Sequence, residues 1–315
     1  MGRKVSIIGA GNVGATIAHI MAISGICHEI VLRDSQIGVA KGKALDMSQA
    51  AQVVGSHSTV KASDLAHDIA DSNIVVVTAG IARKPGMSRD DLLLINAGIM
   101  KSIAKDIKEH APNAIVIVIS NPVDAMTLVM QKATGFDKKR VIGMAGILDA
   151  ARMATFIQEK LGYCGGQIVA SVIGGHGDDM VPLPRYCSVA GLPLSDLLNE
   201  SDIYEIVERT RNGGAEIVEL LQTGSAYYAP AKATSLMIES ILNNTRQIYP
   251  CGAFLNGEYG YSNVVSGVPV LLGINGIEKI IEIPLNDTEK EAFKKSVESV
   301  QELIAVLDKN NFWED

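Results

Sequence analysis

Residues 4–23 have the sequence KVSIIGAGNVGATIAHIMAI, in which a β-branched run leads into three spaced glycines and then an apolar, helix-favouring segment. This order predicts a strand, a glycine turn and a helix, the dinucleotide-binding unit of a doubly wound domain. Gly9 permits the tight turn, Gly11 lets a pyrophosphate approach the backbone, and Gly14 lets the helix pack on the strand. The N–H groups at the start of the helix favour an anion. The predicted phosphate-binding turn comprises Gly9, Ala10, Gly11, Asn12, Val13 and Gly14.

A carboxylate after the second predicted strand, residues 29–33, indicates which dinucleotide binds. Asp34 stands 20 residues beyond Gly14. Its carboxylate can accept hydrogen bonds from ribose hydroxyls and would repel a 2′-phosphate. Arg33 could instead bind such a phosphate, but neighbouring side chains of a strand point to opposite faces. The sequence therefore predicts NAD rather than NADP as the cofactor.

The first half of the chain alternates apolar strands with helical segments. Three further apolar runs follow the two strands above, at 73–78, 114–119 and 141–142. Strands that are apolar throughout are typical of a parallel sheet covered on both faces. We therefore predict an α/β fold in which residues 1–146 form an NAD-binding Rossmann domain, with a doubly wound parallel sheet of five strands. Ligands of such sheets bind at the carboxyl ends of the strands, so the cofactor groove is expected to include Thr78, Ala79, Gly80, Asn96, Ile119, Ser120 and Asn121.

Residues 147–315 differ in character, because long helical patterns alternate with short runs that suggest antiparallel strands. The strand-like runs lie at 168–173, 183–189 and 262–270. Asn286, followed three residues later by Glu289, is a start signal for the last helix. We expect this half to form an α+β domain that binds substrate and carries the catalytic groups.

Composition excludes several classes of partner. The chain has 315 residues, a net charge of −7 and no block of Lys or Arg, which argues against nucleic acid or an anionic membrane as the main partner. Strand-like residues begin almost at once instead of a signal peptide, and no apolar run reaches the roughly 18 residues of a membrane span. The four cysteines are scattered, without the spacing of a zinc site. We expect a cytoplasmic protein without a bound metal.

One histidine stands out as a candidate base. His176 lies in the run GGHGD at 174–178, where flanking glycines expose the imidazole and let a ligand approach. Asp149 and Arg152 are three residues apart on a predicted helix and so share one face. They form either a surface ion pair that contributes little to stability or a functional pair. In the functional pair, Asp149 orients the histidine and Arg152 binds a carboxylate.

The segment 83–89, RKPGMSR, carries a guanidinium at each end of a Pro-Gly loop. Arginine matches a carboxylate in plane and through two hydrogen bonds, so two arginines on one loop favour a small dianion as the ligand. A solvated basic turn is the alternative, since most charge clusters on loops lie on the surface.

Five motifs occur in an order that identifies a family. They are the glycine turn, the 83–89 loop, NPVD at 121–124, LDxxR at 148–152 and GHG at 175–177. In this order, and over nearly its whole length, the chain resembles the lactate/malate dehydrogenase family. Within the family it is similar to the lactate-dehydrogenase-like malate dehydrogenases of bacteria.

The resemblance implies roles for the reacting groups. His176 would accept the hydroxyl proton of the substrate as hydride leaves its carbon for the nicotinamide, and Asp149 would stabilise the imidazolium. Arg89 would move in with its loop and polarise the reacting carbonyl. Arg152 would bind the carboxylate beside that carbonyl.

The same resemblance implies a substrate. Arg83 stands where lactate-specific members carry glutamine, and would bind a distal carboxylate. Asn121 would hydrogen-bond to substrate and help to seat the cofactor, while the small Ala226 would leave room in the pocket. The implied activity is reversible NAD-dependent oxidation of (S)-malate to oxaloacetate, a step of the tricarboxylic acid cycle, by a homodimer or homotetramer.

Two other functions remain open at this point. A lactate or other 2-hydroxyacid dehydrogenase would share the fold and the catalytic set. A non-catalytic, redox-sensing NAD-binding module would need the glycine turn and Asp34, but no base such as His176. A metal-dependent NAD enzyme is disfavoured, because no Cys/His cluster has ligand spacing.

Overall fold

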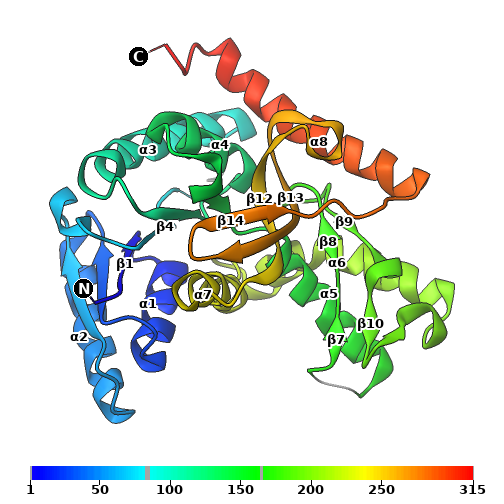
Figure 1. Ribbon diagram of the computed structural model, residues 1–315, viewed down its shortest axis with the longest axis horizontal. Coiled ribbons are helices and arrows are strands. Elements are labelled where there is room, and N and C mark those ends of the chain that lie inside the picture. Colours follow the sequence, from blue (N-terminus) through cyan, green and yellow to red (C-terminus); the bar gives the residue numbers. More distant parts are fainter. Residues whose placement is uncertain (1, 82–85, 164–165, 315) are drawn as a thin grey trace.

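The computed structural model describes residues 2–81, 86–163 and 166–314 (Figure 1). Arg83 and Cys164 therefore lie outside the described residues. Within the described part, nine strands form one sheet that crosses the molecule in the order β14-β13-β12-β6-β5-β4-β1-β2-β3.

Six parallel strands make up the N-terminal part of this sheet. In spatial order they are β3 (Thr59–Ser63), β2 (Glu29–Arg33), β1 (Lys4–Ile8), β4 (Ile74–Val77), β5 (Ile115–Val118) and β6 (Val141–Gly143). The chain changes winding direction between β1 and β4, which is the place where ligands of doubly wound sheets bind. The prediction of a doubly wound parallel sheet is confirmed.

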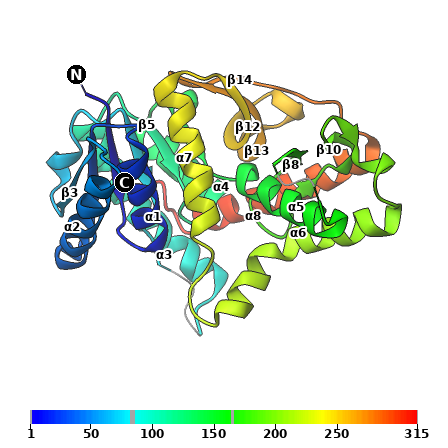
Figure 2. The same ribbon diagram turned by 90° about the horizontal axis from the view of Figure 1, so that it is seen from below.

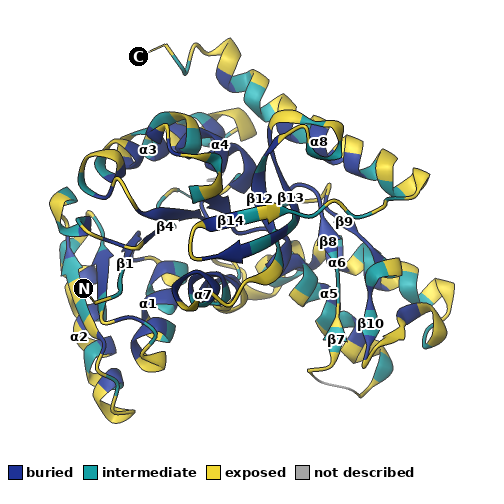
Figure 3. Ribbon diagram, in the orientation of Figure 1, coloured by how far each residue is buried: buried dark blue, intermediate teal, exposed yellow. Residues whose placement is uncertain are grey.

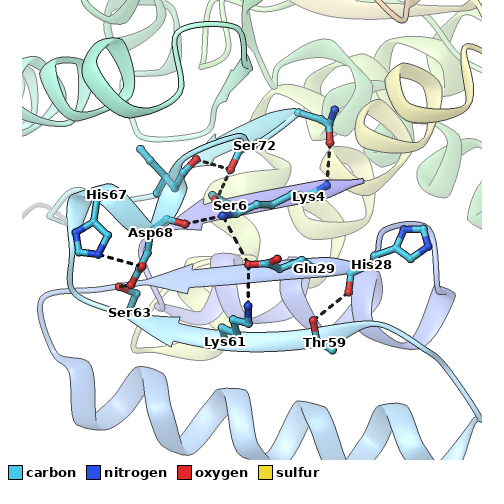
Figure 4. Close-up of polar contacts among 12 residues, drawn as sticks. Lys4, Ser6, His28, Glu29, Thr59, Lys61, Ser63, His67, Asp68 and Ser72 are labelled. Atoms are coloured by element: carbon cyan, nitrogen blue, oxygen red, sulfur yellow. Dashed lines mark hydrogen bonds and ion pairs between the residues drawn. The ribbon is translucent and has the colours of Figure 1, made fainter. Parts of the chain in front are cut away.

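The prediction of five strands is wrong, because β3 adds a sixth at the sheet edge. Its sequence TVKAS alternates between exposed and partly covered positions up to the buried Ser63, so it has no continuous apolar run to reveal it. It pairs in parallel with β2 along its whole length, and polar side chains add contacts (Figure 4). Lys61 Nζ lies 3.2 Å from Glu29 Oε1 on β2, and Thr59 Oγ1 donates to the carbonyl of His28 at 3.1 Å. An edge strand of this kind is identified by its hydrogen bonding to a neighbouring strand in the structure, and not by an apolar sequence.

Helices cover both faces of the sheet. One core contains residues of α1 (Asn12–Ser24), α2 (Ile37–Val53) and α7 (Tyr228–Asn243), and the other contains residues of α3 (Arg89–His110) and α4 (Val123–Thr134). α8 (Asp287–Lys309) contributes to both cores. Successive residues of β4 alternate between the two cores: Ile74 and Val76 join the first, and Val75 and Val77 join the second. The central strands β4, β5 and β6 are therefore buried throughout, whereas the outer helix faces are exposed (Figure 3).

The second half of the chain extends the same sheet with antiparallel strands. These are β12 (Gln247–Asn256), β13 (Ser262–Gly273) and β14 (Gly276–Ile280). β12 joins β6 where Gly252 faces Gly143, and a Cβ on Gly252 would lie 3.1 Å from the Gly143 Cα. α7 also comes from this half, yet it packs beside α1 (Figure 2). The two halves therefore share a sheet and a core.

The remaining elements form the outer part of the second half. α5 (Gly146–Leu161) and α6 (Glu200–Leu221) pack together beside short strands. The run 168–173 divides into β7 (Ile168–Val169) and β8 (Val172–Ile173), and β8 pairs with β9 (Val181–Pro182). β10 (Ser188–Val189) pairs with β7 and with β11 (Leu192–Pro193).

Two local predictions can be compared directly with these elements. The run 183–189 is strand only at its end, because Pro184, which has no N–H to donate, starts a 3₁₀ turn over Pro184–Tyr186. Asn286 caps α8 as predicted, with Glu289 completing a capping box. In the described part of the chain, none of the helices has both the length and the apolar character needed to span a bilayer.

Candidate active site

The glycine turn between β1 and α1 is shaped by its own backbone. Gly9 has φ 111°, and a Cβ there would lie 2.5 Å from Thr78 Oγ1. A Cβ on Gly14 would collide with the Gly9 carbonyl oxygen. A Cβ on Gly11 would meet nothing within 4 Å, so the turn is open on that side. The shape fits a pyrophosphate that approaches the backbone at Gly11.

Asp34 lies against this turn. Its carboxylate accepts hydrogen bonds from the N–H of Ala10 at 2.6 Å and of Gln36 at 2.8 Å. Arg33 turns away from it and forms an ion pair of 2.6 Å with Asp106 on α3. Arg33 is therefore engaged on the opposite face of the sheet, which removes the main argument for a 2′-phosphate. Lys43, which the sequence prediction missed, donates to the carbonyl of Ala10 at 2.7 Å.

A cavity of about 510 Å³ opens at the carboxyl ends of β4 and β5. Asn96 on α3 braces its wall, since its side chain accepts from the N–H of Ile81 at 2.9 Å and donates to the carbonyl of Asn121 at 2.9 Å. Ala226 also lines it, as expected. Predicted cofactor residues that line the cavity are Val13, Thr78, Gly80, Asn96, Ile119, Ser120 and Asn121. Ala79 only borders this wall, where its carbonyl accepts from Ser120 Oγ at 2.6 Å.

His176 and its two predicted partners meet at the other side of this cavity. His176 Nδ1 donates to Asp149 Oδ2 at 2.9 Å, and Arg152 donates to Asp149 Oδ1 at 3.0 Å. The Asp149 side chain is only 2% exposed and those of His176 and Arg152 are 13% exposed. The alternative of a surface ion pair is therefore wrong for Asp149 and Arg152. With Nδ1 engaged, Nε2 is the nitrogen that can exchange a proton with a ligand.

Charges around His176 favour its protonated form. Burial alone lowers the pKa of His176, but the carboxylates of Asp149 and Asp124 outweigh burial, so the pKa lies above its usual 6.5. Asp124 belongs to the NPVD motif, from which no role for it was predicted. It is buried, its Oδ2 accepts from the N–H of His176 at 2.8 Å, and burial raises its pKa to about 6.

Of the two loop arginines, only Arg89 belongs to the part of the chain that the structure describes. Arg89 is the first residue of α3, where Ser88 provides a capping box, and its side chain is exposed outside the cavity lining. Leu92, three residues further along α3, does line the cavity. Arg83 lies outside the described residues. Arg211 on α6 lines the cavity as well and was not predicted, because no motif distinguishes it in the sequence.

No group of three or more His, Cys, Asp or Glu side chains in the described ranges is placed to hold a metal ion. What the site does offer is an open glycine turn with Asp34 beside it, a cavity at the strand ends, and a buried His–Asp–Arg cluster facing that cavity. This set can hold a dinucleotide next to an acid/base group and a carboxylate-binding arginine.

Two family models match the chain. Residues 3–143 match the lactate/malate dehydrogenase NAD binding domain, and residues 147–310 match the lactate/malate dehydrogenase alpha/beta C-terminal domain. A malate dehydrogenase of Sulfurimonas denitrificans is 64% identical over 313 residues, covering 99% of this chain and 98% of the relative. One from Nitratiruptor is 55% identical over 311 residues, covering 98% of each.

Solved structures are similar over the same extent. The apo malate dehydrogenase of Picrophilus torridus superposes with a TM-score of 0.96 at 44% identity, covering 100% of both chains. A lactate dehydrogenase of Cryptosporidium parvum, in complex with lactic acid and NAD, gives a TM-score of 0.94 at 39% identity and covers 98% of both chains. Backbone similarity alone therefore does not distinguish the two substrates.

Proposed function

We propose, because this chain belongs to the lactate/malate dehydrogenase family, that it catalyses the reversible NAD-dependent oxidation of (S)-malate to oxaloacetate. The protein is an NAD-dependent oxidoreductase with a Rossmann domain. The observation that carries the proposal is the buried His176–Asp149–Arg152 cluster, which faces the cavity at the strand ends. A redox-sensing module would have no need for such a base.

The proposed mechanism assigns one task to each side chain. NAD, when bound, supplies the acceptor for the hydride that leaves the substrate carbon. His176 Nε2 takes the hydroxyl proton, and Asp149, hydrogen-bonded to Nδ1, stabilises the resulting imidazolium. Arg152 binds the carboxylate next to the reacting carbon, since its guanidinium lines the cavity and is already oriented by Asp149.

We assign the remaining site residues from motif and position together. Gly9, Ala10, Gly11, Asn12, Val13 and Gly14 would bind the pyrophosphate and Asp34 the ribose, with Thr78, Ala79, Gly80, Asn96, Ile119, Ser120 and Asn121 along the nicotinamide half. Asn121 would also contact substrate. Arg89 is exposed and lies outside the cavity lining. It would therefore reach the substrate carbonyl only when the loop before α3 closes.

Substrate choice is assigned to Arg83. A charge-assisted hydrogen bond contributes about 1.5–3 kcal/mol, and pyruvate would leave a desolvated arginine unpaired at a further cost of about 3–5 kcal/mol. At about 1.4 kcal/mol per tenfold, a discrimination of at least ~10³ between oxaloacetate and pyruvate is expected. The relatives named as malate dehydrogenases support this choice over lactate.

The test is to compare kcat/KM for oxaloacetate and for pyruvate with NADH. We expect kcat/KM for oxaloacetate to exceed that for pyruvate by at least ~10³-fold. Arg83→Gln should reduce this ratio by lowering kcat/KM for oxaloacetate, while kcat/KM for pyruvate stays the same or increases. Equal values, or a preference for pyruvate in the unsubstituted protein, would favour the lactate or other 2-hydroxyacid alternative instead.

The domain division, assembly and location are also proposed. The boundary is placed between residues 146 and 147, and the two matched ranges, 3–143 and 147–310, support it. A homodimer or homotetramer is supported by large apolar side chains on the outer side of α2, where Leu45 is 63% and Val53 is 87% exposed. Light scattering of Leu45→Glu should show a smaller particle than the unsubstituted protein if α2 forms the interface.

We place the enzyme in the cytoplasm, as a participant in the tricarboxylic acid cycle. The three described cysteines, Cys27, Cys187 and Cys251, are free thiols, which fits a reducing compartment. Cell fractionation with detection of NADH-dependent oxaloacetate reduction would test the location.

A further inference from the structure

The turn that carries His176 is held in place by hydrogen bonds to its backbone, in addition to the contact of the His176 ring. Gly174, with φ 87°, exchanges two hydrogen bonds with Gly267 on β13, at 2.8 and 2.9 Å. The N–H of Gly175 donates to Ser296 Oγ on α8 at 2.7 Å, and the N–H of His176 donates to Asp124 Oδ2 on α4 at 2.8 Å. Three elements that are distant in the sequence thus hold three successive residues.

Of these anchors, only Asp124 is ionisable. It lies in the first turn of α4 and is 4% exposed, and its second oxygen, Oδ1, is buried without a hydrogen-bond partner. Burying a carboxylate with an unpaired oxygen is costly. A neutral acceptor satisfies a backbone N–H at lower cost, and Ser296 does this for the neighbouring residue. The use of a carboxylate at this position therefore points to a role for its charge.

The charged groups around Asp124 show which side chain its negative charge can affect. His176 and Asp149 are the charged groups that act on Asp124, and Arg152 acts in turn on His176. The contacts from α8 and β13 to this turn, through Ser296 and Gly267, are neutral. His176 is thus flanked by two carboxylates, with Asp149 at its ring nitrogen and Asp124 at its backbone nitrogen.

We propose that Asp124 is a positioning residue of the reaction, which holds the backbone of His176 and whose negative charge helps to stabilise the imidazolium. The inference rests on the proposed function for its kinetic readout. Asp149 orients the ring and fixes which nitrogen exchanges a proton. Asp124 fixes the backbone position of the turn that carries the ring. It also adds a second negative charge near the imidazolium, where positive charge develops.

The kinetic test compares two substitutions on the same turn. Asp124→Asn keeps an acceptor for the N–H of His176 but removes the charge, whereas Ser296→Ala removes the neutral anchor of Gly175. Reduction of oxaloacetate requires protonated His176, so its kcat/KM falls as pH rises through the pKa of that group. We expect Asp124→Asn to move this alkaline limb about 0.5–1 pH unit toward acid, a loss of about three- to tenfold at pH 8.

Ser296→Ala is expected to leave the position of that limb unchanged, whatever its effect on kcat, and the KM for NADH should be unaltered in both variants. An unmoved limb in Asp124→Asn, or an equal displacement in Ser296→Ala, would show that Asp124 acts only as a structural anchor. If Asp124→Asn does not fold, Asp124→Ser allows the same comparison. Absence of activity in the unsubstituted protein would instead overturn the proposed function.

A second measurement needs neither turnover nor a variant of Asp124. In the unsubstituted protein with ¹³C-carboxyl-labelled aspartate, one resonance should titrate near pH 6. Its midpoint should move in His176→Asn, because that substitution keeps the backbone N–H and removes the imidazolium. If no aspartate midpoint moves in His176→Asn, the charges of Asp124 and His176 do not interact and the proposal is wrong.

Discussion

The glycine turn and the His176 cluster lie on the same cavity but are built in opposite ways. The turn consists of six successive residues after one strand, and its proposed role depends on backbone N–H groups and on the absence of side chains at its glycines. The cluster joins His176 to Asp149 and Arg152, with Asp124 at the backbone of His176, and its proposed role depends on buried charge. Cofactor binding should therefore respond to shape, whereas catalysis should respond to single charges.

Asp149→Asn tests the charge side of this comparison and should have the largest effect. The substitution removes the charge that stabilises the imidazolium and can select the wrong tautomer of His176. We expect kcat for oxaloacetate reduction to fall by about 10³–10⁴-fold, with NADH affinity little changed. Steady-state kinetics and NADH fluorescence titration measure the two quantities separately.

Asp179→Asn is the matched control, because Asp179 is an exposed carboxylate three residues from His176 and does not line the cavity. It should retain the activity of the unsubstituted protein. If Asp149→Asn also retained most of its turnover, buried charge would not be the source of catalysis.

Gly11→Ala and Gly14→Ala test the shape side. A Cβ on Gly11 enters open space, so stability should be kept while the approach of the pyrophosphate is blocked. A Cβ on Gly14 collides with the Gly9 carbonyl, so unfolding free energy should fall by about 1–3 kcal/mol as well. Both variants should bind NADH about 10–100-fold more weakly, as isothermal titration would show.

Urea denaturation supplies the other half of that experiment. Because only the Cβ on Gly14 meets backbone atoms, we expect only Gly14→Ala to lower the urea concentration at the unfolding midpoint. Normal NADH affinity in Gly11→Ala would mean that the pyrophosphate does not approach the backbone there.

The pH dependence should follow the raised pKa of His176 in both directions of the reaction. Oxaloacetate reduction needs the protonated ring, and malate oxidation needs the neutral ring. The kcat/KM for oxaloacetate should fall about tenfold per pH unit above a midpoint higher than 6.5, and that for malate should rise up to the same midpoint. Profiles with a shared midpoint below 6.5 would contradict the role given to the two carboxylates.

A charge cluster outside the site should matter least. Arg209 on α6 pairs with Glu159 at 2.6 Å and with Glu216 at 2.8 Å, but its side chain is 44% exposed. Water and salt screen such pairs, so Arg209→Ala should lower the unfolding free energy by less than about 1 kcal/mol and leave kcat unchanged. A larger loss in urea denaturation would show that exposed charge stabilises this protein more than its burial suggests.

The sequence predicted the doubly wound sheet and the local signals well, because each depends on neighbouring residues. β2 has the predicted bounds, Asp34 lies against the glycine turn, and Asn286 caps α8. It missed β3, since an edge strand lacks a continuous apolar run. It also did not foresee that one sheet joins both halves, which depends on the close approach of two distant glycines.

Within the site, the sequence grouped residues that the structure brings together, but it did not indicate which other side chains contact them. Helix spacing predicted that Asp149 and Arg152 share one face, with Asp149 directed to His176, and in the structure Asp149 contacts both residues. Asp124 and Lys43 were missed, because their roles depend on contacts with backbone atoms far away in the sequence. Arg89 keeps its role only as a proposal that requires closure of the loop.

His176→Asn tests the central claim most directly, because it removes the base from the charged cluster and leaves the glycine turn untouched. NADH affinity and turnover of oxaloacetate would be measured on the same preparation. We predict that NADH binds within about twofold of its normal affinity while kcat falls by about 10²–10⁴-fold. Full turnover in this variant, or an equal loss of NADH binding and turnover, would contradict the separation of cofactor binding from acid/base chemistry.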